Sequence, residues 1–341
     1  MTQDRPALDF LDRRNAAQIA VGFVVALVLL SLLAVGIGTE DIAAELADAD
    51  LGWVAAGCLS TAVGLVAWAR AWQVVLGVAG VGVRFRKLVV TYYAATFANY
   101  VTPLGQAGGE PFIAYVLSRD TDASYEDSLA SVVTADLLNL LPFFTFAAVG
   151  TVVLVVRTTL PDEVRGVAAA LAVFAVGAPL LTVVGWRFRF PIGRFVLRLV
   201  APVARRTRFV TVEGIHRRLR ELNEAFQRIA AEPRSLVRAL VFSYVGWFFF
   251  TLPLYFAVVS LGNTVSLWLV LFIVPASTLA GLTPSPGGLG GVTAALVALL
   301  GVLAGLPTAT GYAVATVYRV ASYWFAVLVG GVAALFVVSR S

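Results

Sequence analysis

The sequence predicts an all-α polytopic membrane protein with six full transmembrane helices and two opposed re-entrant hairpins, about eight helical segments related by an inverted internal repeat. The first observation is composition: 60% of the 341 residues are hydrophobic and 13% are charged, whereas a soluble domain is nearer half apolar and about a quarter charged. The second is a series of apolar runs of membrane-spanning length. The third is a pair of similar Gly/Pro-rich segments half a chain apart.

The same composition excludes several classes of protein. The single cysteine and the single histidine rule out disulfide scaffolds, thiolate clusters and multi-histidine metal sites. The excess of apolar residues argues against nucleic-acid binding and disordered tails. We therefore expect lipid, rather than water, around much of the chain.

Six apolar runs are long enough to cross the roughly 30 Å hydrocarbon core as helices. The first is expected to be a retained anchor, because no Ala-x-Ala cleavage site follows it. We expect one transmembrane domain over 16–338, preceded by a short cytoplasmic segment over 1–15. The runs cover 16–38, 51–78, 127–156, 164–186, 235–261 and 309–338.

The charges between these runs set the orientation. Segment 39–50 carries only acidic charges, 79–90 carries only basic ones, and 187–238 has 13 Arg against 4 Glu. Because basic loops stay in the cytoplasm, we expect 39–50 outside and both basic segments and both termini inside. The preference for Arg over Lys suggests GC-rich coding, so the expected location is the cell membrane of a prokaryote.

Two further apolar stretches, 88–118 and 265–305, are each broken by Gly and Pro. A helix over 88–101 would reach only about 21 Å, which is less than the hydrocarbon thickness. With the loops assigned as above, the first stretch enters from the cytoplasm and returns there, and the second enters from outside and returns outside. The sequence therefore predicts two opposed re-entrant hairpins.

The hairpin tips have similar sequences, TPLGQAGG from Thr102 and TPSPGGLGG from Thr283, and their prolines are 181 positions apart. We predict one repeat over about 51–156 and a second over about 235–338. A basic linker containing an amphipathic helix, 187–234, joins them. Inverted repeats with broken helices commonly enclose a transporter's binding site near the membrane midplane. The alternative is that Gly and Pro simply make tight turns between buried helices.

The first tip contains several candidate binding residues. Glu110 precedes Pro111 and either caps a helix or binds a cation, a proton or a headgroup amine. Backbone N–H groups at Gly105, Gly108 and Gly109 would be open to an anion such as a phosphate. The candidates of the first tip are Asn99, Thr102, Pro103, Gly105, Gln106, Gly108, Gly109 and Glu110, and those of the second are Pro284, Gly287, Gly288, Gly290 and Gly291.

Asp136 and Arg319 are 183 positions apart, so the repeat places them at equivalent positions, roughly 15 Å deep. Charges at that depth face the protein interior and find partners. We interpret Arg319 as the ligand of an anionic group in a transport cavity, with Asp136 balancing its charge. Asn139 and Tyr323 extend these polar stripes. The alternative is a buried Asp136–Arg319 pair with a packing role.

Other features near the cytoplasmic side have less specific interpretations. Arg70 is expected to snorkel toward the membrane interface, and Trp68 and Trp72 fit an interfacial aromatic belt. The amphipathic stretch 208–231 is expected to lie on anionic headgroups. A solvated linker is the alternative for that stretch.

The first tip, together with the Phe97–Tyr100 motif before it, resembles the first signature of the flippase-like membrane family. This family includes the transmembrane region of lysylphosphatidylglycerol synthases and is also known as an uncharacterised membrane protein family. Residues 283–291 resemble the second signature, and the last crossing from Arg319 to Gly331 is similar too. The resemblance covers roughly 15–338 and implies a protein that moves, or helps to move, a polar lipid between leaflets. The positions carried over are Asn99, Pro103, Gly108, Gly109, Glu110, Pro284, Gly290, Gly291 and Arg319.

The lysyl-transferring relatives carry a soluble catalytic domain after the membrane part, whereas three residues follow Val338 here, so lipid aminoacylation is not expected. We expect a lipid flippase or transporter rather than an enzyme, with no cofactor and no metal. Its expected partners are membrane lipids with polar or anionic headgroups, and not nucleic acid. The sequence leaves open whether the protein forms a homo-oligomer. The alternatives are a membrane-embedded lipid-modifying transferase, a small-solute or ion permease, and a scaffold without transport activity.

Overall fold

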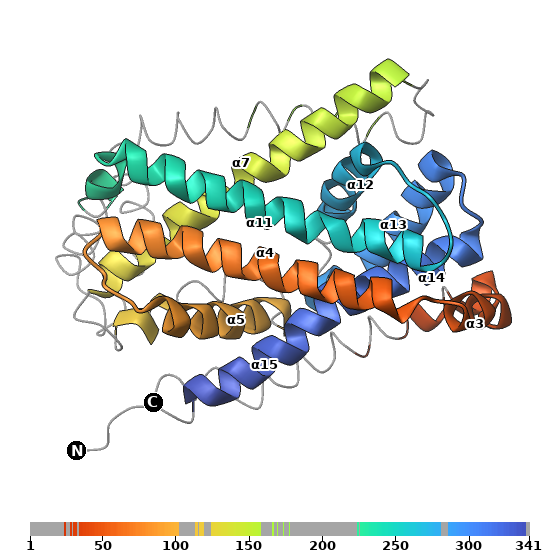
Figure 1. Ribbon diagram of the computed structural model, residues 1–341, viewed down its shortest axis with the longest axis horizontal. Helices are drawn as coiled ribbons and strands as arrows, with labels where there is room; N and C mark the ends of the chain where they lie inside the picture. The colour runs from red at the N-terminus through yellow and green to blue at the C-terminus, as the bar shows by residue number, and fades with distance from the viewer. Residues whose placement is uncertain are drawn as a thin grey trace, which may run out of the picture.

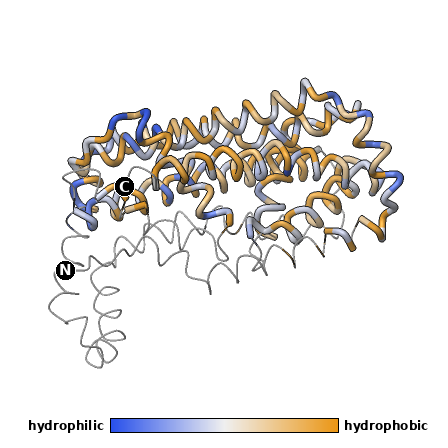
Figure 2. The backbone as a smooth tube through the Cα atoms, turned by 90° about the horizontal axis from the view of Figure 1, so that it is seen from below, coloured by the Kyte–Doolittle hydropathy of each residue, from blue (hydrophilic) through white to orange (hydrophobic). Residues whose placement is uncertain are grey.

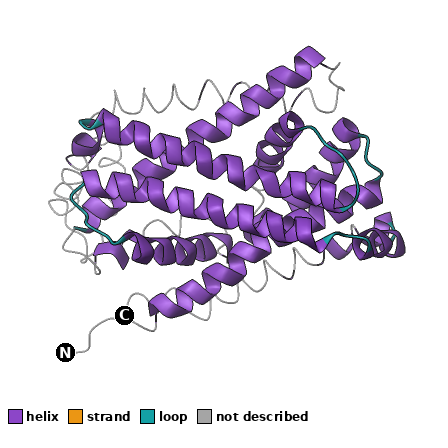
Figure 3. Ribbon diagram, in the orientation of Figure 1, coloured by secondary structure: helices purple, strands orange, loops and turns teal. Residues whose placement is uncertain are grey.

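The computed structural model describes residues 34–101, 124–157, 226–280 and 286–338, with isolated positions or short stretches within 24–32, 113–118, 166–177 and at 224. The described residues form helices and connecting loops without a strand (Figure 3), which confirms the predicted all-α class. The predicted crossings 16–38 and 164–186 lie mostly outside the described residues. Five described helices are long and apolar enough to cross a membrane, as expected of a multi-pass membrane protein.

The described elements follow one another as shown in Figure 1. They are α3 (Thr39–Ala47), α4 (Leu51–Val78), α5 (Phe85–Val101), α7 (Tyr125–Arg157), α11 (Pro233–Ser260), α12 (Leu267–Ala280), the 3₁₀ turn η1 (Pro286–Gly288), α13 (Leu289–Ala304), α14 (Thr308–Arg319), the π-helical turn η2 (Val320–Trp324) and α15 (Phe325–Val338). The five candidate spans are Leu51–Val78, Tyr125–Val156, Pro233–Ser260, Pro286–Ala304 and Thr308–Val337.

Helices α4 and α11 lie antiparallel and side by side in the centre of the molecule (Figure 1). Glycines allow their backbones to approach closely. A Cβ atom on Gly64 would lie 3.0 Å from the carbonyl oxygen of Gly246, and one on Gly246 would lie 2.4 Å from the Trp68 ring. Small residues at such crossings are typical of helix packing in membranes, where close van der Waals contact drives association.

The other helices pack around this central pair. Helix α5 lies against α15, α12 lies against α7 and α13, and α13 in turn contacts α14. Two further glycines permit close contacts. A Cβ atom on Gly330 would lie 2.4 Å from the carbonyl oxygen of Tyr93, and one on Gly150 would lie 2.8 Å from the backbone nitrogen of Phe272.

Polar and apolar segments separate along the long axis of the bundle. In Figure 2 hydrophilic segments gather mainly toward the two ends, and hydrophobic segments fill much of the middle. Large apolar side chains also cover the outside: Val152, Val241 and Leu328 are 60%, 55% and 70% exposed. Such exposure suits contact with lipid, whereas in water patches of this kind would drive association.

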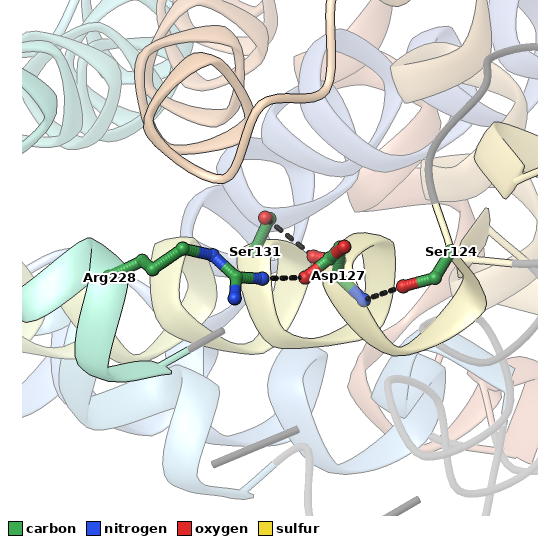
Figure 4. Close-up of polar contacts among 4 residues, drawn as sticks. All are labelled: Ser124, Asp127, Ser131 and Arg228. Atoms are coloured by element: carbon green, nitrogen blue, oxygen red, sulfur yellow. Dashed lines mark hydrogen bonds and ion pairs between the residues drawn. The ribbon is translucent and has the colours of Figure 1, made fainter. Parts of the chain in front are cut away.

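Helix α7 begins with a side-chain cap that Figure 4 shows. The Asp127 backbone N–H donates to Ser124 Oγ at 3.0 Å, and Ser131 Oγ donates to the Asp127 carbonyl at 2.7 Å. The Asp127 carboxylate pairs with Arg228, from the helical segment before α11. The next residue, Ile229, is buried in the bundle core. This last turn of the predicted amphipathic stretch therefore packs on protein, and most of the remainder lies outside the described residues.

We expect Gly330→Ala to lower the midpoint temperature of thermal unfolding in detergent. The added methyl group would overlap the Tyr93 carbonyl oxygen, and overpacking costs about 1–3 kcal/mol. Gly331→Ala on the same helix is the matched control, because the nearest atom there is on the Phe97 ring at 3.4 Å. Equal midpoints for the two variants would contradict the close approach of α5 and α15.

Candidate functional site

Arg319 lies at the end of α14 with its side chain buried in the bundle, at 9% exposure. Its Nη2 donates a hydrogen bond to the Gly287 carbonyl oxygen at 2.9 Å, and its guanidinium carbon lies 4.4 Å from the centre of the Tyr323 ring. Its Nε is buried without a hydrogen-bond partner. Among the described residues no carboxylate contacts this guanidinium, so it presents a donor that an anionic oxygen would satisfy.

The Gly287 carbonyl belongs to the tight turn of the second tip. Gly287 and Gly288 have φ angles of 54° and 62°, in the left-handed region that glycine adopts without strain. A Cβ atom on Gly287 would also lie 2.0 Å from Cε2 of Tyr323, so the position has no room for a side chain. Gly290 and Gly291 follow in the first turn of α13. Pro284 lies outside the described residues.

The end of α5 meets the same place from the other half of the chain. The Tyr100 and Tyr323 rings stack with centroids 5.2 Å apart, and the Tyr323 hydroxyl donates to the Tyr100 carbonyl at 3.3 Å. Asn99, beside Tyr100, has a buried side-chain oxygen without a hydrogen-bond partner. The other predicted residues of the first tip, Thr102, Pro103, Gly105, Gln106, Gly108, Gly109 and Glu110, lie outside the described residues.

A π-helical turn, Val320–Trp324, interrupts the last crossing directly after Arg319. A π turn disturbs the regular ladder of backbone hydrogen bonds, and such turns occur frequently at functional sites. Thr61 of α4 compensates locally, because its Oγ1 donates to the Ala321 carbonyl at 2.8 Å. Nothing in the hydrophobic pattern of 309–338 had indicated this irregularity.

Asp136 and Arg319 have different partners in the structure. The half-buried Asp136 carboxylate accepts a hydrogen bond from Trp72 Nε1 at 3.1 Å. One turn later, the Asn139 carbonyl accepts from Trp247 Nε1 at 2.8 Å. The polar stripe of α7 therefore faces α4 and α11.

These tryptophan contacts correct one expectation from the sequence. Trp68 and Trp72 are buried, at 8% and 3% exposure, so their assignment to an interfacial belt is wrong. Buried tryptophans usually find a partner for the ring N–H: Trp72 donates to Asp136, whereas Trp68 Nε1 is buried without a hydrogen-bond partner.

The described chain offers donors for an anion rather than ligands for a metal. No group of three His, Cys, Asp or Glu side chains gathers in the part of the chain that the structure describes. Arg319, the Gly287 turn and the end of α5 instead bring together a cation, aromatic rings and segments from both halves of the chain. Such a site suits a phosphate or carboxylate group.

Comparison with known proteins gives a consistent result over nearly the whole chain. Residues 19–330 match the family described as the lysylphosphatidylglycerol synthase TM region. A UPF0104 membrane protein of Pyrococcus horikoshii is 23% identical over 92% of this chain and 95% of its own. Two UPF0104 membrane proteins of Methanothermobacter thermautotrophicus are 25% and 26% identical, over 98% and 93% of this chain and 97% and 94% of theirs.

We expect Arg319→Met to unfold at the same temperature as the wild type or above it. The variant leaves the Gly287 carbonyl unpaired, at a cost of about 1–3 kcal/mol. It also removes a buried cation, and replacing buried charges by apolar groups often stabilises by about 1–4 kcal/mol.

Tyr323→Ala serves as the destabilised reference in the same thermal assay. Deleting this fully buried ring should cost about 3–5 kcal/mol. If Arg319→Met were as unstable as Tyr323→Ala, Arg319 would have a structural role and the interpretation as a ligand-binding cation would fail.

Proposed function

Because the chain belongs to the family of the lysylphosphatidylglycerol synthase TM region, we propose that it transports a lipid with a polar headgroup across the cell membrane. The headgroup, anionic or zwitterionic, would cross through a midplane cavity that opens alternately to the two sides. Both termini and the basic loops would face the cytoplasm. Membership of a lipid-related membrane family supports this proposal, and the arrangement of the helices supports it further.

The packing of the helices supports an inverted repeat. Gly64 and Gly246 are 182 positions apart in the sequence and face each other where α4 crosses α11. The packing of α4 on α5 has its counterpart in α11 on α12, and that of α5 on α15 in α12 on α7. A twofold axis between the two glycines would relate all these pairs, as in transporters built from inverted repeats.

The short helix α12 and the connections of α12 and α13 support a re-entrant hairpin at the second tip. Helix α12 has 14 residues and reaches about 21 Å, less than the hydrocarbon thickness, whereas α13 has 16 residues and together with η1 forms the 19-residue candidate span Pro286–Ala304. Both open at the same end of the bundle, since short loops join them to the end of α11 and the start of α14. Helix α5 begins at the opposite end, directly after α4. Two tips that approach from opposite sides would meet beside Arg319.

The buried Arg319 guanidinium with its unpartnered Nε is the observation that carries the proposal. Arg319 would bind the phosphate of the headgroup as it passes the tips. Asn99 and the glycine turns would add neutral hydrogen bonds. Glu110 would bind an amine, a proton or a coupling ion, and Asp136 would balance the positive charge of the cavity. The protein itself would catalyse no covalent step.

Lipid movement can be measured directly in proteoliposomes that contain a fluorescent phospholipid and the purified full chain. We expect Arg319→Gln to slow translocation by roughly ten- to a hundredfold, the usual worth of a hydrogen bond to a charged group. Glu110→Gln should slow it as well. Arg84→Gln is the control, since Arg84 is exposed in the loop before α5 and should not change the rate.

Three results would each contradict the proposal. Wild-type rates in both Arg319→Gln and Glu110→Gln would show that the site is wrongly placed. Uptake of a polar solute without lipid movement would favour a permease. Formation of a modified lipid from a labelled donor by the purified protein would favour a membrane-embedded transferase.

A further inference from the structure

A second basic site lies at the other end of α4. A cavity of about 500 Å³ opens between the last turns of α4 and the first turns of α11, lined by polar side chains that include Arg70, Gln73, Ser235 and Arg238. Thr61 is level with Ala321 in the last crossing, and Arg70 follows nine residues later, about 14 Å along the helix. The cavity is therefore separate from the Arg319 site.

Arg70 is held in one position by three elements of the fold. Its guanidinium donates to Gln73 Oε1 and lies 5.5 Å from the centre of the Phe85 ring and 5.9 Å from that of Phe242. Gln73 is itself fixed, because its Nε2 donates to the Val83 carbonyl at 2.9 Å. No described carboxylate pairs with Arg70. Arg70 is thus a preorganised, half-buried cation with unused donors.

The rest of the lining favours an anion. Arg238 is exposed at the cavity, and Ser235 adds a hydroxyl group. Helix α11 begins here, and its positive dipole end adds to the field. Glu232 is the one carboxylate among the described residues of the lining, and its side chain makes no capping hydrogen bond to the helix. Two guanidinium groups against one carboxylate leave the cavity with a positive charge.

We propose that this cavity binds the phosphate of an anionic phospholipid from the neighbouring leaflet, where basic loops indicate the cytoplasm. Basic pockets between transmembrane helices on this side are suited to lipid headgroups. The apolar surroundings favour a lipid over a free phosphate ion: Val74 and Val78 line the cavity, and Val237 and Val241 nearby on α11 are largely exposed. These side chains would contact the acyl chains.

Among the described residues, the repeat gives Arg70 no basic counterpart at the other end of the bundle. The repeat places Leu252 at the position equivalent to Arg70, so the opposite end of the α4–α11 pair has no matching cation there. An anionic lipid would therefore bind first from one leaflet. If the chain transports lipids as proposed above, the cavity is where cargo docks before it reaches Arg319, and this part of the inference rests on that function.

Lipid retention by the full chain in nanodiscs tests the binding site. The nanodiscs contain equal amounts of phosphatidylglycerol and phosphatidylcholine, and native mass spectrometry counts the lipids that stay bound. We expect Arg70→Gln and Arg238→Gln each to reduce the bound phosphatidylglycerol about fivefold, with phosphatidylcholine unchanged. Glu232→Gln should increase it, because this variant removes a negative charge from the lining. Arg84→Gln is the control outside the cavity.

Two outcomes would overturn the proposal. One is equal phosphatidylglycerol retention in the wild type and the Arg70→Gln/Arg238→Gln double variant. The other is loss of the bound lipid on adding millimolar inorganic phosphate, which would identify a soluble phosphate site. If an arginine variant fails to fold, the expected increase in bound phosphatidylglycerol with Glu232→Gln still tests the proposal. Retention that depends on Arg70 but not on Arg319, in a protein without translocation activity, would support this site and reject the transport function.

Discussion

The contacts of the buried Arg319 guanidinium join distant parts of this structure. Because Arg319 is only 9% exposed, its guanidinium needs oxygen atoms or aromatic rings of the protein as partners. It finds the Gly287 carbonyl and the Tyr323 ring. Tyr323 in turn stacks on Tyr100. Three segments that are distant in the sequence are thereby held together, and the tight glycine turn is required because a side chain at Gly287 would occupy the space of the Tyr323 ring.

Much of the helical framework could be predicted from the sequence. The apolar runs 51–78, 127–156, 235–261 and 309–338 each correspond to a described span within two or three residues, because long hydrophobic segments leave the backbone no alternative to a helix in lipid. The glycine turn at 287–288 was also located. The amino-acid pattern did not predict helix α3. This helix, Thr39–Ala47, covers most of the acidic segment 39–50 that follows the first apolar run.

The residues of the site were easier to predict than the contacts that they make. The sequence indicated that Asp136 and Arg319 were both deep, but hydrophobicity alone does not fix the rotation of a helix that is apolar on all sides. Asp136 accordingly contacts Trp72, a residue that composition had assigned to the interface. The π turn after Arg319 was missed for a related reason: it depends on Thr61 of a distant helix, which supplies the hydrogen bond to Ala321.

That π turn is the point at which a change of register in the last crossing would begin. It holds more residues per turn than an α-helix does, so displacing it by a few positions toward α15 would shift the residues that it passes by about one residue along the axis, or about 1.5 Å, and would leave the remainder of α15 in place. The far end of α14 is anchored, since Thr310 donates to the Glu45 carboxylate of α3 at 2.7 Å. A shift of this kind would break the Tyr100–Tyr323 stack while the anchored end of α14 stayed in place. The contacts beside Arg319 would therefore be the first in this crossing to separate.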